Sequence, residues 1–347
     1  MLGPLLVGIS GSTLDSAERE LLRSPAVGGV VLFTRNYNNP AQLTEMTGEI
    51  HALREPPLVI AVDHEGGNVQ RFRPGFTELP HPRWLGRVYD VDPGTGLDLA
   101  QTFAWLLAAE LRACGVDLSF APVLDIDAGI SRVIGNRGLH SDPSAIARLG
   151  HAWVRGMRRA GMAAVGKHFP GHGSVEADSH VAIPCDTRSL AEIARADLIP
   201  FQRLAGSGLP GMMAAHVVYP DVDDRPAGFS PRWIGDILRR RLRYQGAVLS
   251  DDLGMVGAAT AGSLKDRVAA ALAADCDAAL ICDPDQAQEA VAGSSLTMHP
   301  TAALRLARLH GGPAPGREQL HASDAYQVAL DQITTGIPGL PPPEPRS

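Results

Sequence analysis

Three observations predict that the chain folds as a single (β/α)₈ TIM barrel of the α/β class. First, eight short apolar runs alternate with longer amphipathic stretches along its 347 residues. Second, the runs are rich in Val, Ile, Leu and Ala without strict alternation, which is typical of parallel strands covered on both faces. Third, neither a GxGxxG nor a Walker loop follows the first run, whereas an open doubly wound sheet would need such a feature in its crevice. Eight strand–helix units therefore favour a closed barrel.

The apolar runs define eight expected strands: Leu5–Ser10, Gly29–Phe33, Leu58–Asp63, Val116–Ala121, Ala163–His168, Gly211–His216, Ala247–Asp251 and Ala278–Cys282. Several of the segments between them open with Pro, which is tolerated in the first turn of a helix because the N–H that it lacks would be unpaired there. The expected helices are Ser16–Arg23, Pro40–Arg54, Leu97–Cys114, Pro143–Ala160, Leu190–Ala205, Pro231–Arg241 and Ser263–Ala274.

The last part of the chain differs from the barrel repeat. We expect a catalytic barrel over residues 1–292 and a helical extension over 293–336 that packs on the barrel. Helices are expected at Thr301–Leu309 and Arg317–Ile333. Residues 337–347 form a Pro-rich tail, which we expect to be disordered because it has too few apolar side chains to bury.

Composition narrows the class of protein. The chain is 45% hydrophobic and carries a formal net charge of −7, so it offers no electrostatic reason to bind nucleic acid or an anionic membrane. The apolar stretch Leu5–Ile9 is too short for a membrane span or a signal sequence. Cys114, Cys185, Cys276 and Cys282 form no CxxC pair and no zinc spacing, and we expect free thiols. We therefore expect a soluble, cytoplasmic protein. We also expect it to be a monomer.

Ionisable residues stand at the ends of five expected strands. In a TIM barrel the C-terminal strand ends meet at one mouth, where catalytic groups lie. A mouth so dense in hydrogen-bonding groups suits a sugar, because each hydroxyl must exchange a water partner for a protein partner. The residues at or just after these ends are Asp63, Asp125, Lys167, His168, His216 and Asp251.

The loop after the fifth strand is the most specific feature. It begins at Lys167 and reads KHFPGHG, with two Gly and one Pro that favour an irregular backbone. At its far end Asp178 stands two residues before His180. A carboxylate beside an imidazole orients the ring and favours its charged form. The pair is therefore a candidate for proton transfer.

Three segments carry a family resemblance. IAVDHEGGNVQRF, KHFPGHGSVEADSH and VLSDDLGM resemble the signatures of the bacterial β-N-acetylhexosaminidases of glycoside hydrolase family 3. The similarity runs from the first expected strand to Cys282, roughly four-fifths of the chain. It is greatest to the single-domain cytoplasmic kind that acts in peptidoglycan recycling.

The resemblance implies a role for each matching residue. Asp251 matches the nucleophile, His180 the acid/base, and Asp178 the carboxylate that holds it. The residues that match sugar-binding positions are Asp63, Arg71, Arg137, Lys167 and His168. His216 is a further candidate for sugar contact, with loop scaffolding as its alternative role. Glu65 is expected to support these residues rather than to catalyse. His64 and Asn68 depart from the family pattern, but neither removes a group that the mechanism needs.

The resemblance also implies a reaction. A retaining exo-β-N-acetylglucosaminidase would remove terminal β-1,4-linked GlcNAc from peptidoglycan fragments through a covalent glycosyl-enzyme. Its substrate would be GlcNAc linked to anhydro-N-acetylmuramic acid (anhydroMurNAc), with or without peptide. No metal and no organic cofactor are expected.

Two alternatives from other classes remain open. A metal-dependent barrel hydrolase would use His168, His172, His216 and Asp251 as ligands, although the sequence has no HxH or HExxH spacing. A catalytically silent sugar-binding protein would keep the barrel and the pocket. Such a protein has no need of a nucleophile together with the Asp178/His180 pair.

Overall fold

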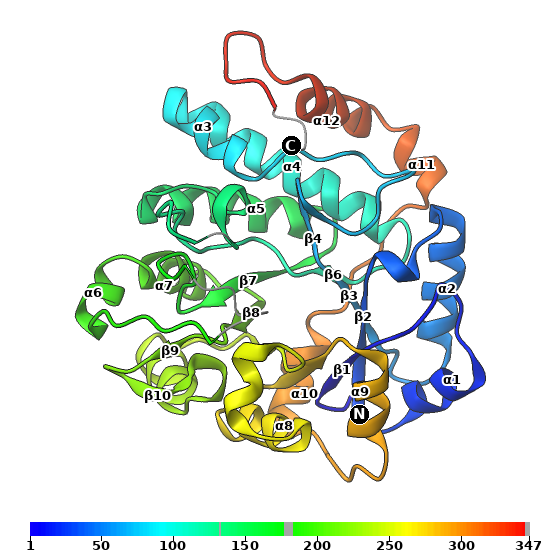
Figure 1. The fold of residues 1–347 in the computed structure, drawn as a ribbon. Helices are drawn as coiled ribbons and strands as arrows, with labels where there is room; N and C mark the ends of the chain where they lie inside the picture. The colour runs from blue at the N-terminus through cyan, green and yellow to red at the C-terminus, as the bar shows by residue number, and fades with distance from the viewer. Residues whose placement is uncertain (132, 177–182, 344–347) are drawn as a thin grey trace.

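Eight parallel strands close into a barrel in the computed structural model, which describes residues 1–131, 133–176 and 183–343 (Figure 1). Each strand pairs with its neighbours in the order β1-β12-β11-β8-β7-β6-β3-β2. The predicted TIM barrel is confirmed, and each expected run overlaps one barrel strand. These strands are β1 (Leu5–Gly8), β2 (Val27–Leu32), β3 (Val59–Val62), β6 (Leu118–Ser119), β7 (Ala163–Phe169), β8 (Gly211–Ala214), β11 (Ala247–Asp252) and β12 (Ala278–Ile281).

The barrel strands are short and almost wholly buried. All residues of β1, β2, β3, β8 and β12 are buried. Helices cover the outer face while side chains fill the interior, which explains why the strands read as continuous apolar runs. The strand β6 has only two residues, Leu118 and Ser119, yet it joins β3 to β7 and closes the ring.

Helices surround the barrel, and several are capped as their sequences predict. Asn39 and Asp142 cap α2 and α5, each followed by Pro at the first turn, and Ser263 forms a capping box at α8. The helices between the strands are α1 (Ser16–Arg23), α2 (Pro40–Ala52), α4 (Pro93–Arg112), α5 (Pro143–Arg159), α7 (Leu198–Gly206), a π-helix (Arg232–Arg241), α8 (Leu264–Ala273) and α9 (Pro284–Val291).

The structure differs from the expected helices in three places. The helix expected over Leu190–Ala205 is broken into α6 (Leu190–Arg195) and α7, because Pro200 has no N–H to donate to the carbonyl of Ala196 and its ring crowds that carbonyl. The short helix α3 (Arg83–Val91) was not expected; Asp92 ends it and caps α4. The eight-residue helix α9 was also missed.

Two small hairpins follow barrel strands. The first, β4 (His64–Gly66) with β5 (Val69–Gln70), comes directly after β3. The second, β9 (Val218–Tyr219) with β10 (Asp223–Pro226), comes after β8. Both belong to loops that leave the C-terminal ends of strands, where a barrel places its site.

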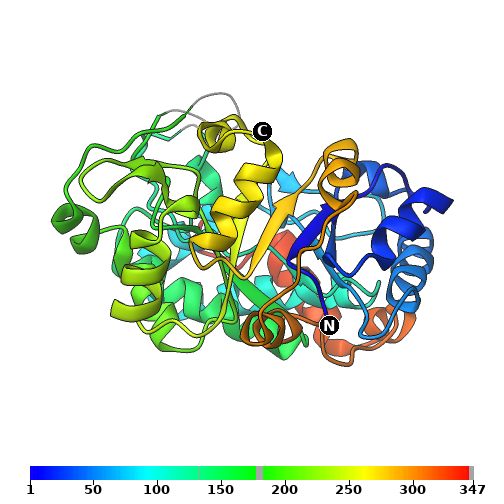
Figure 2. The ribbon, with the colours of Figure 1, turned by 90° about the horizontal axis from the view of Figure 1, so that it is seen from below.

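Three C-terminal helices pack against the barrel: α10 (Pro300–Ala307), α11 (Arg317–His321) and α12 (Asp324–Thr335). Figure 2 shows α10 at the end from which the strands start, where Arg305 Nη1 lies 3.1 Å from Asp277 Oδ1. The helix α12 packs on α4, and Tyr326 Oη donates a 2.8 Å bond to Glu110. The Trp84 indole N–H donates a 2.9 Å bond to the carbonyl of Pro341.

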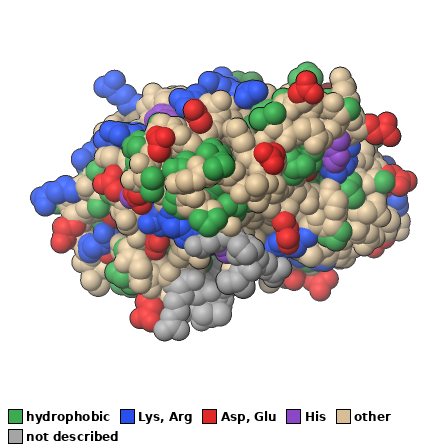
Figure 3. Space-filling view, turned by 90° about the horizontal axis from the view of Figure 1, so that it is seen from above, with side chains coloured by type: hydrophobic (Ala, Val, Ile, Leu, Met, Phe, Trp, Pro, Cys, Tyr) green, Lys and Arg blue, Asp and Glu red, His purple; other side chains and the backbone are tan. Residues whose placement is uncertain are grey.

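The surface is mixed in charge. On the face shown in Figure 3, acidic and basic side chains are interspersed. Within the described ranges, no helix is both long and apolar enough to cross a membrane.

Candidate active site

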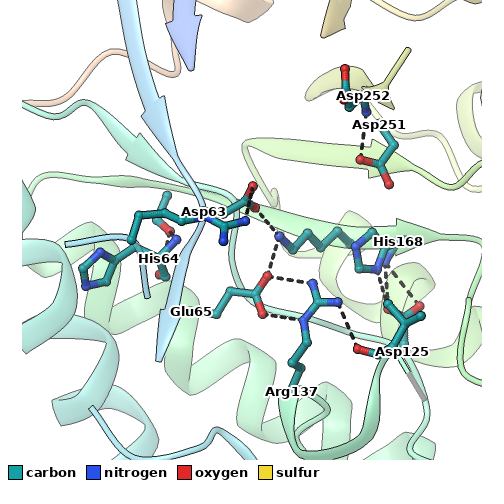
Figure 4. Close-up of polar contacts among 12 residues, drawn as sticks. Asp63, His64, Glu65, Asp125, Arg137, His168, Asp251 and Asp252 are labelled. Atoms are coloured by element: carbon teal, nitrogen blue, oxygen red, sulfur yellow. Dashed lines mark hydrogen bonds and ion pairs between the residues drawn. The ribbon is translucent and has the colours of Figure 1, made fainter. Parts of the chain in front are cut away.

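A pocket of about 180 Å³ lies among the C-terminal ends of the barrel strands. Its wall brings together six of the residues that the sequence singled out (Figure 4). They are Asp63, Arg71, Arg137, Lys167, His168 and Asp251; Phe33, His172, Asp252 and Cys282 also line the pocket. Asp178 and His180 lie outside the described residues.

Lys167 links two carboxylates at the floor of the pocket. Its Nζ lies 2.7 Å from Asp63 Oδ1 and 2.6 Å from Glu65 Oε1, and its side chain is only 2% exposed. Burial opposes the charge of the ammonium, but Asp63 and Glu65 outweigh it and raise the pKa of Lys167. Arg71 Nη2 lies 3.8 Å from the other oxygen of Asp63. The ammonium is therefore held as a cation in a fixed position.

Glu65 binds Arg137 through two parallel bonds. Arg137 Nε donates to Oε2 at 2.9 Å and Nη2 to Oε1 at 2.8 Å. Burial of Glu65 disfavours its charge, but Arg137 and Lys167 outweigh burial and hold the pKa of the carboxyl well below its usual range. Glu65 thus joins two of the predicted sugar-binding side chains and fixes the place of each.

Asp125 orients His168, a role that the sequence reasoning did not assign. Its Oδ2 lies 2.6 Å from His168 Nδ1, and its Oδ1 accepts a 2.7 Å bond from the backbone N–H of His172. With Nδ1 occupied by Asp125, the other ring nitrogen of His168 remains for the pocket. The one sequence feature that pointed to a role for Asp125 in the site was its position just after the fourth expected strand.

Asp251 and Asp252 end β11 but have different surroundings. Asp252 Oδ1 accepts backbone N–H bonds from Gly254 at 3.1 Å and Cys282 at 3.0 Å. Asp251 Oδ1 accepts one such bond, from Asp252 at 2.8 Å, and its carboxylate turns toward the His168 side of the site (Figure 4). Asp252 is therefore hydrogen-bonded to the backbone of the segments that follow β11 and β12.

The two carboxyls also differ in their electrostatics. Burial raises the pKa of Asp251, but the nearby imidazoles of His168 and His216, the Asp252 N–H and the ammonium of Lys167 outweigh burial, and the pKa is lowered overall. Burial raises the pKa of Asp252, and the neighbouring charge of Asp251 adds to this rise. Asp251 is therefore the more acidic carboxyl of the pair.

His216 does not line the pocket. Its side chain is fully buried, and its ring packs on Phe229 with centroids 5.1 Å apart. Burial lowers the pKa of His216, which favours the neutral ring. This placement corrects the expectation that His216 contacts a sugar and favours its alternative role as scaffold.

Phe33 is a pocket residue that the sequence reasoning missed. The guanidinium of Arg35 lies 4.5 Å from its ring centroid and that of Arg71 lies 5.6 Å away. Arg35 is held by the carbonyls of Ile9 at 2.9 Å and Cys282 at 2.7 Å. Phe33 ends an apolar run, and nothing in the sequence distinguishes it from the core residues before it.

The metal-ligand alternative can be compared with the geometry. Across residues 1–131, 133–176 and 183–343, His, Cys, Asp and Glu side chains form no group of three or more that could hold a metal ion. Of the four ligands that this alternative requires, His168, His172 and Asp251 line the pocket, whereas His216 is fully buried and does not.

Comparison with known proteins agrees with the fold. The model of the glycosyl hydrolase family 3 N-terminal domain matches residues 5–308. Similar sequences include the beta-hexosaminidases of Alkalilimnicola ehrlichii, 54% identical over 96% of both chains, and of Bordetella avium, 54% identical over 96% of this chain and 97% of that one.

Solved structures show the same relationship. NagZ from Neisseria gonorrhoeae in complex with N-trifluoroacetyl-D-glucosamine superposes with a TM-score of 0.91 at 44% identity, covering 96% of this chain and 97% of that chain. A family 3 beta-N-acetylglucosaminidase from Paenibacillus sp. has a TM-score of 0.83 at 29% identity, covering 95% of this chain and 66% of that one. The chain therefore belongs to glycosyl hydrolase family 3, within the group of its β-N-acetylhexosaminidases.

Proposed function

We propose that this hexosaminidase is a retaining exo-β-N-acetylglucosaminidase with Asp251 as its nucleophile. One observation carries the proposal: both adjacent carboxyls line the pocket, but Asp252 accepts two backbone N–H bonds, whereas Asp251 accepts one and turns toward His168 with a lowered pKa. An ionised carboxylate beside a bound sugar can attack the anomeric carbon and form a covalent glycosyl-enzyme, which water then hydrolyses.

The remaining pocket residues are proposed to hold one terminal sugar. Asp63, Arg71, Arg137, Lys167 and His168 supply both donors and acceptors around the same cavity. Its volume of about 180 Å³ is below the usual range of pockets for drug-sized ligands. A small polar pocket of this kind favours removal of a single terminal residue over cleavage within a chain.

His180 is proposed as the acid/base, held by Asp178. Retaining glycosidases usually carry a second carboxylate for this role. An imidazole has an unperturbed pKa of about 6.5, so it can protonate the leaving oxygen and later take a proton from water near neutral pH. This assignment rests on the sequence motif that begins at Lys167.

The proposed substrate is GlcNAc β-1,4-linked to an anhydroMurNAc residue, with or without peptide, and the proposed context is peptidoglycan recycling in the cytoplasm. The similarity to NagZ from N. gonorrhoeae, which was solved with N-trifluoroacetyl-D-glucosamine bound, supports an N-acylated glucosamine in the pocket. We propose that the enzyme acts as a monomer.

The test is an assay with p-nitrophenyl glycosides, followed by proton NMR of the first-formed sugar. The proposal expects release of nitrophenol from the N-acetyl-β-glucosaminide, none from the β-glucoside, and the β-anomer of GlcNAc as the initial product. Activity should survive a strong chelator, because no step requires a metal. Initial formation of the α-anomer would exclude the retaining mechanism. Binding of GlcNAc without turnover would favour the sugar-binding alternative.

A further inference from the structure

A second cavity, of about 500 Å³, lies at the opposite end of the barrel from the catalytic pocket. Met162, Ala163 and Pro210 in its wall stand at the starts of β7 and β8. The rest of the wall comes from α5, from the turn after α7 and from the segment after α10. The side chains with polar groups in this wall are His151, Arg155, Arg158, Ser207, Arg308 and His310.

The wall is cationic and includes no carboxylate. Three arginines line it, and Arg155 is fixed by a 3.1 Å bond from its Nε to Gln101. Among the residues that the structure describes, no carboxylate forms an ion pair with Arg155, Arg158 or Arg308. This concentration of positive charge occurs on a chain with a net charge of −7.

The negative ends of nearby helix dipoles neutralise only part of this positive charge. Arg158 lies in the last turn of α5 and Arg308 caps the end of α10, so each residue stands at a helix C-terminus. The helix α7 also ends here, at Ser207. A helix C-terminus carries roughly half a negative charge. Three ends therefore supply about one and a half negative charges, against three lining arginines and the nearby Arg203.

The remaining polar groups are neutral or available for hydrogen bonding. Burial, with the charges of Arg155 and Arg203, lowers the pKa of His151, whose Nδ1 lies 3.2 Å from Ser207 Oγ. His310 Nδ1 faces Asp117 at 3.7 Å, and its buried Nε2 has no hydrogen-bond partner within the described part of the chain. Asp117 is already bonded to Arg112 at 3.0 Å and to His51 at 2.9 Å.

We propose that this cavity, defined by Arg155, Arg158 and Arg308, binds a small soluble molecule that carries a phosphate group. A phosphate ester bears about −1.5 to −2 charges at neutral pH and three acceptor oxygens, which matches the excess charge and the donors of the wall. The volume of the cavity falls within the usual range for small-molecule sites. The site is separate from the catalytic pocket, and the proposal is independent of the glycosidase mechanism.

Isothermal titration calorimetry with inorganic pyrophosphate tests the proposal. The full chain is titrated at constant ionic strength with GlcNAc saturating the catalytic pocket. One site is expected. Arg158→Gln and Arg308→Gln should each raise the Kd about tenfold, since each removes a charge-assisted hydrogen bond. The matched control is Arg159→Gln on the same helix, because Arg159 stacks on Trp105 outside the cavity wall and should leave the Kd unchanged.

Arg158 and Arg308 are both exposed, so their substitution should leave the thermal unfolding temperature and the hexosaminidase activity unchanged. Three results would overturn the proposal. They are the absence of binding heat, equal Kd values for the cavity variants and the unsubstituted protein, and an equal loss in Arg159→Gln. An equal loss in Arg159→Gln would show that pyrophosphate binding depends only on the net charge of the protein.

Discussion

Glu65 and Arg137 form a two-bond ion pair beneath the catalytic pocket, with N–O distances of 2.9 and 2.8 Å. Lys167 adds a third contact to the same carboxylate at 2.6 Å. Glu65 is only 1% exposed, so water does not readily take its place beside Arg137 and Lys167. Glu65 is thus a positioning residue for two side chains that we propose to bind the sugar.

The first prediction concerns stability. Glu65→Gln should lower the free energy of unfolding by about 3–5 kcal/mol, because it removes the charged partner of Arg137 and one of the two carboxylates that contact the buried Lys167. Urea denaturation followed by circular dichroism measures the change. The control is Glu78→Gln, whose carboxylate is exposed and 3.5 Å from Arg73; its loss should be below about 1 kcal/mol. Equal effects of the two substitutions would contradict a structural role for the Glu65 pair.

The second prediction concerns pH. His168 contributes the largest favourable charge at Asp251, so His168→Gln should raise the pKa of that carboxyl and move the acidic limb of kcat/KM to higher pH. The sign follows from linkage: the lowered pKa keeps Asp251 ionised as pH falls, and loss of the cation removes this protection. Rates on a p-nitrophenyl substrate between pH 3 and 8 measure the limb. A limb that stays in place would contradict the electrostatic coupling.

The third prediction tests His180 as acid/base. A general acid matters most for a poor leaving group, so His180→Ala should slow cleavage of a natural disaccharide by about 10²–10⁴-fold. It should spare formation of the glycosyl-enzyme from a dinitrophenyl glycoside, whose phenolate leaves without protonation. Asp178→Asn should show the same pattern more weakly. Equal slowing of both substrates would show that His180 is a binding residue. Glu65 and Asp252 would then be the next candidates for the acid/base.

The barrel was predictable because its signal repeats. Eight apolar runs each become a buried strand, and strand ends such as Asp63 and Asp251 meet at one mouth because parallel strands share a direction. The break between α6 and α7 had a signal in the sequence that the expected helix ignored, since Pro200 cannot donate to Ala196, the residue that caps the end of α6. Helices α3 and α9 were missed because each is less than three turns long, which leaves few residues in which a helical pattern can repeat.

The sequence indicated which residues lie in the site, but not which of their side chains contact one another. Polar side chains at the strand ends indicate a pocket, yet the pairing of Glu65 with Arg137 spans 72 positions of the chain and has no local signal. The misplacement of His216 has the same cause. A histidine at a strand end can face the pocket or the core, and only the packing on Phe229 shows that it faces the core.

The central claim is that Asp251 becomes covalently bound to the sugar. The direct measurement is labelling with a 2-acetamido-2-deoxy-5-fluoro-β-glucosyl fluoride, followed by peptide mass mapping. Fluorine slows hydrolysis of the ester, so the intermediate should accumulate with the label on Asp251. Asp251→Ala should prevent labelling and lower activity by several orders of magnitude, while Asp252→Ala should leave the position of any label unchanged. A label on Asp252, or no covalent adduct on an enzyme that the reagent inactivates, would contradict the account.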